Sequence, residues 1–293
     1  MKRIQLVPNL ITLANAFCGL LAIAKAIDAL ALSGDDPIVF YRKMETACLL
    51  IFLGMVFDSL DGFVARLTRA YSDFGAQLDS FSDALTFGVA PAMLAKVLIE
   101  HEGALTGWEG DSRLHFLAAA AFALMAILRL VRFNLETEHE KSAHAHFKGL
   151  PSPAAAGAVA STIWLYLILR RPELEVVEGT PTTFQRVLGW MEGVDWSPVL
   201  AWVPGVLVCM LPLLGLLMVS NVRYLHPVIA LSRGRTQFVT LVVIVFSIFL
   251  FLLAPVPFAY VLFNGFVVMG LVHMCWSLAR GRKSANSESQ PGP

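Results

Sequence analysis

Long apolar runs separated by short polar segments are the main pattern of this chain of 293 residues. A run of about 20 apolar residues is long enough to cross a bilayer as a helix. The pattern predicts about eight such helices and therefore an all-α, polytopic integral membrane protein. Their expected bounds are 8–31, 44–67, 74–99, 114–134, 151–169, 198–220, 237–254 and 256–279.

The breaks between the runs indicate how the chain is organised. Only Ala254-Pro255-Val256-Pro257 separates the last two runs, which predicts a helical hairpin. Polar residues dominate from Arg280 onward, which predicts a disordered cytoplasmic tail. We therefore expect a membrane core of six helices, then the hairpin, then the tail. Their expected ranges are 1–236, 237–279 and 280–293.

The composition agrees with a membrane location. Hydrophobic residues make up 57% of the chain and charged residues 15%, with a mean hydropathy of +0.67. A soluble protein of this size needs more charge to cover its surface. The formal net charge is zero and no basic arm is present, so nucleic acid is not an expected partner. The cysteines are scattered through apolar segments and predict no disulfide framework: Cys18, Cys48, Cys209 and Cys275.

Basic residues near the ends of the runs predict the orientation. With the N-terminus inside, the inner segments carry more lysine and arginine than the outer segments, although Arg42 and Lys43 count against this arrangement. We therefore expect both termini, and the connection between the second and third helices, to face the cytoplasm. Polar Asn9, Thr12 and Asn15 interrupt the first run, so we interpret it as a retained span and not as a signal peptide.

Four aspartates lie in one short, otherwise apolar stretch: Asp58, Asp61, Asp79 and Asp83. Each would be unfavourable by roughly 2.5–3.5 kcal/mol at the centre of a bilayer. The first two are three positions apart and the last two are four apart, so each pair projects from one face of its helix. Two facing helices would then present an oxygen-rich site suited to two divalent ions, Mg²⁺ or Mn²⁺.

Small and basic residues accompany these acids. Gly62, Ala65 and Gly75 lack bulk, so that a base or a diphosphate can approach the backbone. Arg66 can hold a phosphate or orient an aspartate. An alternative interpretation treats all these positions as ordinary helix-end residues. It suits Asp73 as a helix cap, but it does not explain four acids together.

Other polar residues are candidates for substrate contacts. Arg129 lies inside an apolar run and needs an anionic partner, either an embedded aspartate or a phosphate or carboxylate of a substrate. Arg132 and Lys148 lie nearer the interface, where the excess of basic residues on the inner side explains them equally well. Asn9 and Thr12, at the start of the first helix, are either capping residues or substrate contacts.

The acidic stretch has eight residues in a fixed spacing, Asp58-x2-Asp61-Gly62-x2-Ala65-Arg66-x8-Gly75-x3-Asp79-x3-Asp83. This pattern resembles the signature of the CDP-alcohol phosphatidyltransferase family, whose members move a phosphatidyl group from a CDP-linked lipid to an alcohol and release CMP. The resemblance implies that the four aspartates are metal ligands and that Asp83 is the general base, with Asp79 as the other catalytic acid. The residues implied to line the CDP pocket are Gly62, Ala65, Arg66 and Gly75.

Further segments are similar to the phosphatidylserine synthase branch of that family, the membrane-integral bacterial and archaeal type. They are Pro8-Asn9-Leu10-Ile11-Thr12, Arg129-Leu130-Val131-Arg132-Phe133-Asn134 and Phe147-Lys148-Gly149-Leu150-Pro151. The resemblance implies CDP-diacylglycerol and L-serine as substrates, a cytoplasmic membrane location and a homodimer. Serine would need a cation for its carboxylate, and the candidates are Arg129, Arg132 and Lys148.

Two alternatives remain at this point. The first keeps the family chemistry with another acceptor: choline, glycerol 3-phosphate or an inositol phosphate. A phosphorylated acceptor would favour a denser basic cluster than these segments supply. The second is a cation transporter, which predicts acids distributed along a pathway across the bilayer. The acids of this chain instead gather in two adjacent helices. The residues do not decide between direct transfer and a covalent intermediate.

Overall fold

The computed structural model describes residues 6–32, 37–68, 72–106, 111–139, 149–170, 196–220 and 237–288. These ranges are helical almost throughout and contain no β-strand, which confirms the predicted all-α class. The elements are α1 (Leu6–Leu32), α2 (Pro37–Thr68), α3 (Asp73–Asp83), η1 (Ala84–Val89), α4 (Ala90–Thr106), α5 (Ser112–His139), α6 (Ser152–Arg170), α8 (Ser197–Leu200), α9 (Val203–Val219), α11 (Gln237–Leu253) and α12 (Pro255–Glu288).

Most of these helices have the length and apolarity of membrane spans. Seven such spans occur in the described part of the chain: Leu6–Leu32, Ile38–Thr68, Asp73–Gly103, Ser112–Leu135, Ser152–Arg170, Ser197–Val219 and Pro255–Val272. The eighth predicted span corresponds to α11, which is strongly apolar and has 17 residues. That length is the lower limit for crossing, about 17 residues. The chain is an integral membrane protein with the polytopic architecture that its apolar runs predict.

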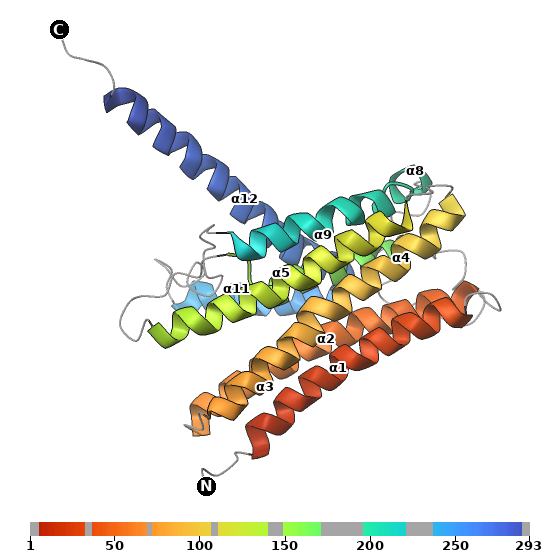
Figure 1. Ribbon diagram of the computed structural model, residues 1–293, viewed down its shortest axis with the longest axis horizontal. Coiled ribbons are helices and arrows are strands. Elements are labelled where there is room, and N and C mark those ends of the chain that lie inside the picture. The colour runs from red at the N-terminus through yellow and green to blue at the C-terminus, as the bar shows by residue number, and fades with distance from the viewer. Residues whose placement is uncertain are drawn as a thin grey trace.

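The helices from α1 to α9 form one bundle (Figure 1), in which α1 packs along α2 and α5 packs along α9. Helices α3 and α4 follow one continuous path beside α1, because only the π-helix η1 separates them. Asp83 is the last residue of α3, so the wider π turn begins directly after it. Such turns occur often at functional sites.

Helix α6 is the most enclosed span, with 72% of its apolar window buried. Small residues on a helix allow neighbouring helices to approach closely. At Gly157, an added Cβ would lie 2.4 Å from ring atom Cδ1 of Phe263 on α12. Next to this contact, Asn264 Nδ2 donates hydrogen bonds to Ser161 Oγ and Thr162 Oγ1, both at 3.3 Å. The packing of the Phe263 ring on Gly157 and the hydrogen bonds from Asn264 therefore hold α12 against α6.

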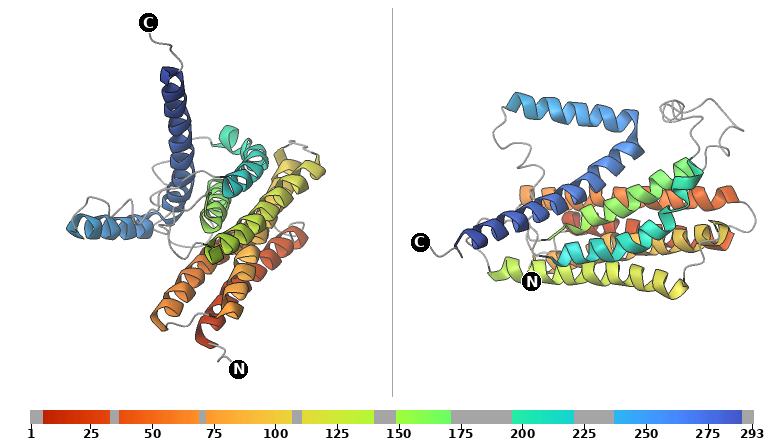
Figure 2. Two further views of the ribbon diagram at one scale, coloured as in Figure 1. Left: turned by 60° about the vertical axis from the view of Figure 1, so that its left-hand side comes forward. Right: turned by 90° about the horizontal axis from the view of Figure 1, so that it is seen from above.

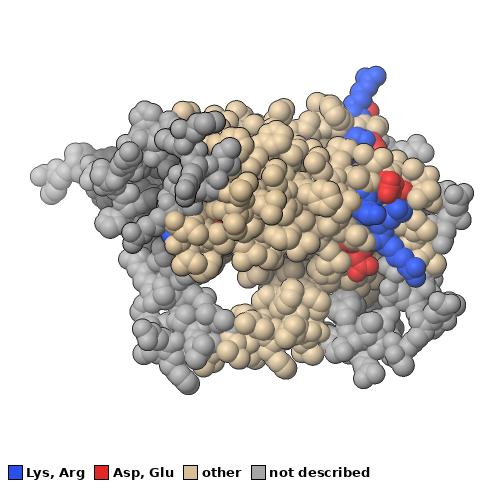
Figure 3. Space-filling model, turned by 90° about the horizontal axis from the view of Figure 1, so that it is seen from below, with Lys and Arg blue, Asp and Glu red and all other residues tan. Residues whose placement is uncertain are grey.

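A buried carboxylate joins three helices at the opposite end of the bundle from the four aspartates. Glu102 of α4 is 0% exposed and accepts hydrogen bonds from Tyr41 Oη of α2 at 2.8 Å and Tyr166 Oη of α6 at 2.5 Å. Arg170 Nε lies 3.5 Å from the same carboxylate. In Figure 3, charged side chains gather mostly at one end of the visible face, next to a broad uncharged surface, as expected for a bundle that crosses a bilayer.

The C-terminal part differs from the prediction in one respect. The break between α11 and α12 falls at Ala254, within the predicted turn, and Figure 2 shows the two helices joined at this tight corner. However, α12 continues to Glu288, whereas we expected disorder from Arg280. No proline occurs between Pro257, in the first turn of α12, and Pro291, so no proline forces the helix to stop at the end of the apolar run. Residues 289–293 lie outside the described part.

Candidate active site

Four acidic side chains meet where α2 and α3 face each other. Asp58 and Asp61 lie on α2, and Asp79 and Asp83 lie on α3. Carboxylate oxygens of Asp58, Asp61 and Asp79 lie within 4.8 Å of one another. The side chain of Asp83 contacts that of Asp58 and lies close to Asp79. The spacings of three and four residues thus bring the acids together, as expected from helix periodicity.

The cluster contains buried oxygens that lack a hydrogen-bond partner. Among the described residues, Asp61 Oδ2 and Asp79 Oδ1 have none. An unsatisfied buried polar atom costs about 1–3 kcal/mol, and more when the group is charged. A hard divalent cation binds carboxylate oxygens and would satisfy both atoms. The donor set therefore fits a divalent metal ion.

Helix α1 places three polar side chains beside the acids. Asn9, Thr12 and Asn15 are all buried and recur on one side of the helix. Thr12 Oγ1 donates to the backbone carbonyl four residues earlier at 3.1 Å, and its side chain lies beside Asp61. Asn15 Nδ2 donates to Asp83 Oδ1 at 3.2 Å. The sequence placed Asn15 on the same polar face as Asn9 and Thr12, but it did not indicate Asp83 as its partner.

Gly75 lies where the first turn of α3 packs against α1. The backbone N–H of Gly75 donates to Ser72 Oγ at 3.0 Å, which caps the helix. An added Cβ on Gly75 would lie 3.0 Å from that Oγ and 3.2 Å from Asn9 Oδ1. The missing side chain is therefore explained by the cap and the helix contact as well as by the predicted approach of a ligand.

The last turns of α2 carry the other predicted CDP contacts. Gly62 and Ala65 are half-buried and Arg66 is exposed. An added Cβ on Gly62 would meet only Arg66 Nη1, at 3.8 Å. Accessible backbone thus lies next to a guanidinium group, close to the acids, and this combination suits a phosphate.

Arg129 of α5 supplies a positive charge to the acidic cluster. Its Nη1 donates to Ser152 Oγ at 2.6 Å, and Ser152 is buried at the start of α6. The guanidinium interacts electrostatically with Asp83 and Asp58. The embedded aspartates are therefore close enough to compensate the charge of an arginine inside an apolar run.

The remaining candidates lie around the end of α5. Arg132 Nη1 donates to the backbone carbonyl of Val219 at 2.9 Å, so this arginine joins α5 to the end of α9. Lys148 lies outside the described residues. Asn134 was not predicted, yet its Nδ2 donates to Ser80 Oγ of α3 at 2.8 Å. Its signals in the sequence were its place at the end of an apolar run and in the segment from Arg129 to Asn134.

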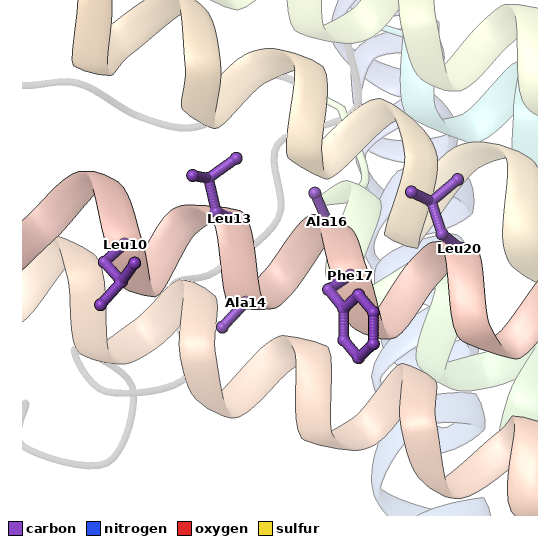
Figure 4. A pocket seen from close by; sticks show the side chains of 6 residues that line it. All are labelled: Leu10, Leu13, Ala14, Ala16, Phe17 and Leu20. Carbon is purple, nitrogen blue, oxygen red and sulfur yellow. The ribbon is translucent and has the colours of Figure 1, made fainter.

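Another face of α1 carries a shallow, open apolar pocket lined by this helix alone (Figure 4). It is lined by Leu10, Leu13, Ala14, Ala16, Phe17 and Leu20. The same helix therefore presents polar groups to the acids and an open apolar surface elsewhere, and this surface is compatible with contact to hydrocarbon chains.

Comparison with known proteins gives consistent matches. The family model for CDP-alcohol phosphatidyltransferase matches residues 5–194. The CDP-diacylglycerol–serine O-phosphatidyltransferase of Bacillus subtilis is 37% identical over 149 residues, which cover 51% of this chain and 70% of that protein. The protein of the same name from Helicobacter pylori (strain 26695) is 29% identical over 221 residues, or 75% of this chain and 72% of that protein. Archaetidylserine synthase of Methanothermobacter thermautotrophicus is 37% identical over 157 residues, or 53% and 56%.

Proposed function

Because this chain belongs to the CDP-alcohol phosphatidyltransferase family, we propose that it transfers a phosphatidyl group from CDP-diacylglycerol to the hydroxyl of L-serine and releases CMP. The observation that carries the proposal is the convergence of carboxylates from α2 and α3 near the half-buried Arg129. The relatives support serine as the acceptor, because serine forms part of each of their names.

The aspartates would hold two divalent ions, Mg²⁺ or Mn²⁺. The ligands would be Asp58, Asp61, Asp79 and Asp83, and the unpartnered oxygens of Asp61 and Asp79 support this assignment. When bound, the ions neutralise the diphosphate and stabilise the leaving phosphate of CMP.

Asp83 acts as the general base in the chemical step. It accepts the proton of the serine hydroxyl, and the hydroxyl oxygen attacks the phosphorus that bears the lipid. The bond from this phosphorus to the oxygen of CMP then breaks. Asp79, one turn earlier on α3, is the second proposed catalytic residue. Arg129 interacts electrostatically with Asp83 and is proposed to bind the serine carboxylate, which would hold the hydroxyl near its base. Arg132 and Lys148 add positive charge for the acceptor.

The donor binds with its head group between the helices and its acyl chains in the bilayer, against the apolar pocket on α1. The residues proposed to contact the donor are Asn9, Thr12, Gly62, Ala65, Arg66 and Gly75. From the distribution of basic residues, we place the site and both termini on the cytoplasmic side of a bacterial or archaeal cytoplasmic membrane. We also propose that the protein works as a homodimer.

The test is CMP release by purified protein in detergent with CDP-diacylglycerol and Mn²⁺ or Mg²⁺. L-serine, choline, glycerol 3-phosphate and inositol phosphate are supplied separately. We expect release with serine alone, no release after chelation of the metal, and no release by Asp79→Asn. Release with a different acceptor would keep the chemistry and refute serine. Absence of release with every acceptor would refute the transferase and favour a cation transporter.

A further inference from the structure

Asn15 is a fully buried amide at the contact of α1, α2 and η1, with an exposed fraction of 0%. Its Nδ2 donates to Asp83 Oδ1 at 3.2 Å. Its Oδ1 has no hydrogen-bond partner among the described residues. Because an unpaired buried acceptor costs about 1–3 kcal/mol, stability alone does not explain an asparagine at this position.

The surroundings hold this amide in place. Thr86 Oγ1 of η1 donates to the backbone carbonyl of Asn15 at 2.9 Å. An added Cβ on Gly54 of α2 would lie 3.0 Å from Asn15 Oδ1 and 2.5 Å from Thr86 Cγ2. An added Cβ on Gly19 of α1 would lie 2.5 Å from Thr86 Oγ1. Because Gly19 and Gly54 lack side chains, α1, α2 and η1 pack closely around the Asn15 amide. The amide therefore has little room to rotate.

We propose that Asn15 is a positioning residue for Asp83, an inference that rests on the proposed role of Asp83 as general base. An ionised carboxylate has two acceptor oxygens. The bond from Asn15 occupies one of them and fixes the rotation of the carboxyl group, so the other oxygen keeps one direction toward the acceptor hydroxyl. A neutral amide does this without adding charge to the acidic cluster.

The hydrogen bond from Asn15 reaches Asp83 at a point where the helix geometry changes. Asp83 is the last residue of α3, where the backbone passes into the wider turn of η1. A hydrogen bond from a neighbouring helix therefore supports the carboxyl group where its own helix changes geometry. Asn15 acts only through Asp83, so its loss is expected to lower kcat and to leave KM for both substrates nearly unchanged.

The experiment compares Asn15→Ala with Cys18→Ala in the purified full-length protein. Cys18 is a matched control, because it is buried one turn further along α1 and its Cβ lies 3.7 Å from an added Cβ on Gly54. CMP release gives kcat and KM, electron paramagnetic resonance gives Mn²⁺ affinity, and thermal unfolding gives stability. For Asn15→Ala we expect kcat to fall about 10–100-fold, the usual range for a residue that orients a functional group. We expect KM to change little, Mn²⁺ affinity to fall less than kcat because Asp83 is also a proposed metal ligand, and wild-type kcat for Cys18→Ala.

Three results would overturn the inference: wild-type kcat in Asn15→Ala, an equal loss in both variants, or a loss confined to KM or Mn²⁺ affinity. If Asn15→Ala does not fold, Thr86→Val provides the test, since it removes the hydroxyl that holds the Asn15 carbonyl. A fall in kcat with unchanged KM supports the inference, and an unchanged kcat opposes it. Absence of CMP release by the wild-type protein would refute the proposed function itself, and this inference with it.

Discussion

The four aspartates repel one another unless positive charge is placed among them. Asp58 and Asp83 are in contact, and Asp79 lies close to both. Arg129 contributes a single positive charge, fewer than four ionised carboxylates would require. Each carboxylate alone would be unfavourable in lipid. Because the four lie close together, the same cations can compensate all of them.

Asp83→Asn tests the general base. We expect kcat to fall by about 100-fold or more, because general base catalysis contributes roughly 10²–10⁴-fold. CDP-diacylglycerol binding should be retained in part, which a filter-binding or calorimetric titration can measure. Asp73→Asn, the same change at an exposed position of α3, serves as the control and should keep wild-type turnover. Turnover close to wild type in Asp83→Asn would remove Asp83 from its role.

Arg129→Lys tests the acceptor site. A lysine keeps the charge but loses the planar fork that pairs with a carboxylate. We expect KM for serine to rise about tenfold, as for the loss of one charged hydrogen bond. KM for CDP-diacylglycerol should change little. Arg113→Lys, at the far end of α5, is the control. A rise confined to the KM for CDP-diacylglycerol would assign Arg129 to the donor instead.

The sequence indicates which residues belong to the candidate site better than it indicates the hydrogen bonds between them. Helix periodicity alone places each pair of acids on one face of its helix. In contrast, the bond from Asn15 to Asp83 joins residues 68 positions apart, and the bond from Asn134 to Ser80 joins residues 54 apart. Both depend on how α1 and α5 pack against α3, which no local pattern contains.

Among the helices, the bonds to Glu102 are expected to hold the far end of the bundle together. Glu102→Gln replaces an acceptor for two tyrosines and an arginine by an amide with a single oxygen. We expect the free energy of unfolding to fall by about 1–3 kcal/mol. Glu102 is remote from the four aspartates, so CMP release below the melting temperature should be unchanged. Differential scanning fluorimetry in detergent measures the shift.

Glu100→Gln is the matched control for that experiment. Glu100 pairs with Lys96 at 2.8 Å and is partly exposed, with 25% of its side chain accessible. Partly exposed ion pairs of this kind contribute about 0–1 kcal/mol. A melting temperature that falls as far in Glu100→Gln as in Glu102→Gln would contradict the special role of the buried carboxylate.

The packing of α12 on α6 leads to another prediction. Gly157→Ala would force Phe263 to move, because the new Cβ would lie 2.4 Å from the ring. We expect lower thermal stability by about 1–3 kcal/mol, as for other overpacked contacts. Gly265→Ala on α12 is the control, since an added Cβ there meets nothing within 4 Å. Replacing an open helical glycine by alanine should stabilise the protein by up to about 1 kcal/mol. Equal effects of the two changes would contradict the close contact.

Hydropathy locates the spans but not the ends of the helices. We expected the second helix over 44–67, whereas α2 begins at Pro37. The polar residues of its first turns, such as Arg42 and Lys43, are helical without being apolar. The π-helix η1 was not predicted, because its residues are as apolar as those of a regular helix and the widened turn depends on the surrounding packing.

For the molecule as a whole, the direction in which it crosses the membrane can be tested by labelling. In a background without native cysteines, Thr68→Cys and Arg113→Cys are placed at exposed positions near the end of α2 and the start of α5. We expect a membrane-impermeant thiol reagent to label Thr68→Cys only in inverted vesicles and Arg113→Cys only in intact cells. The reverse pattern would place the acidic site on the outer side and refute the proposed orientation.

The division into a core and a C-terminal hairpin stays a prediction at this scale. The apolar runs and the turn at Ala254 suggested it, and the bonds from Asn264 to α6 show that α12 is nonetheless attached to the bundle. Such contacts join segments about 100 residues apart, so composition cannot anticipate them.

The exposure of α11 has a consequence for the membranes that suit this protein. Its main packing partner among the described elements is α12, and apolar side chains such as Val245, Phe249 and Leu252 are exposed, so lipid meets much of its surface. At 1.5 Å per residue, its 17 described residues extend about 26 Å, close to the thickness of a hydrocarbon layer of about 30 Å. A helix held mainly by one neighbour has few protein contacts to oppose a change in bilayer thickness, which costs fractions of a kcal/mol per Å of mismatch. Lengthening the acyl chains of the host membrane should therefore shift α11 before the helices of the bundle.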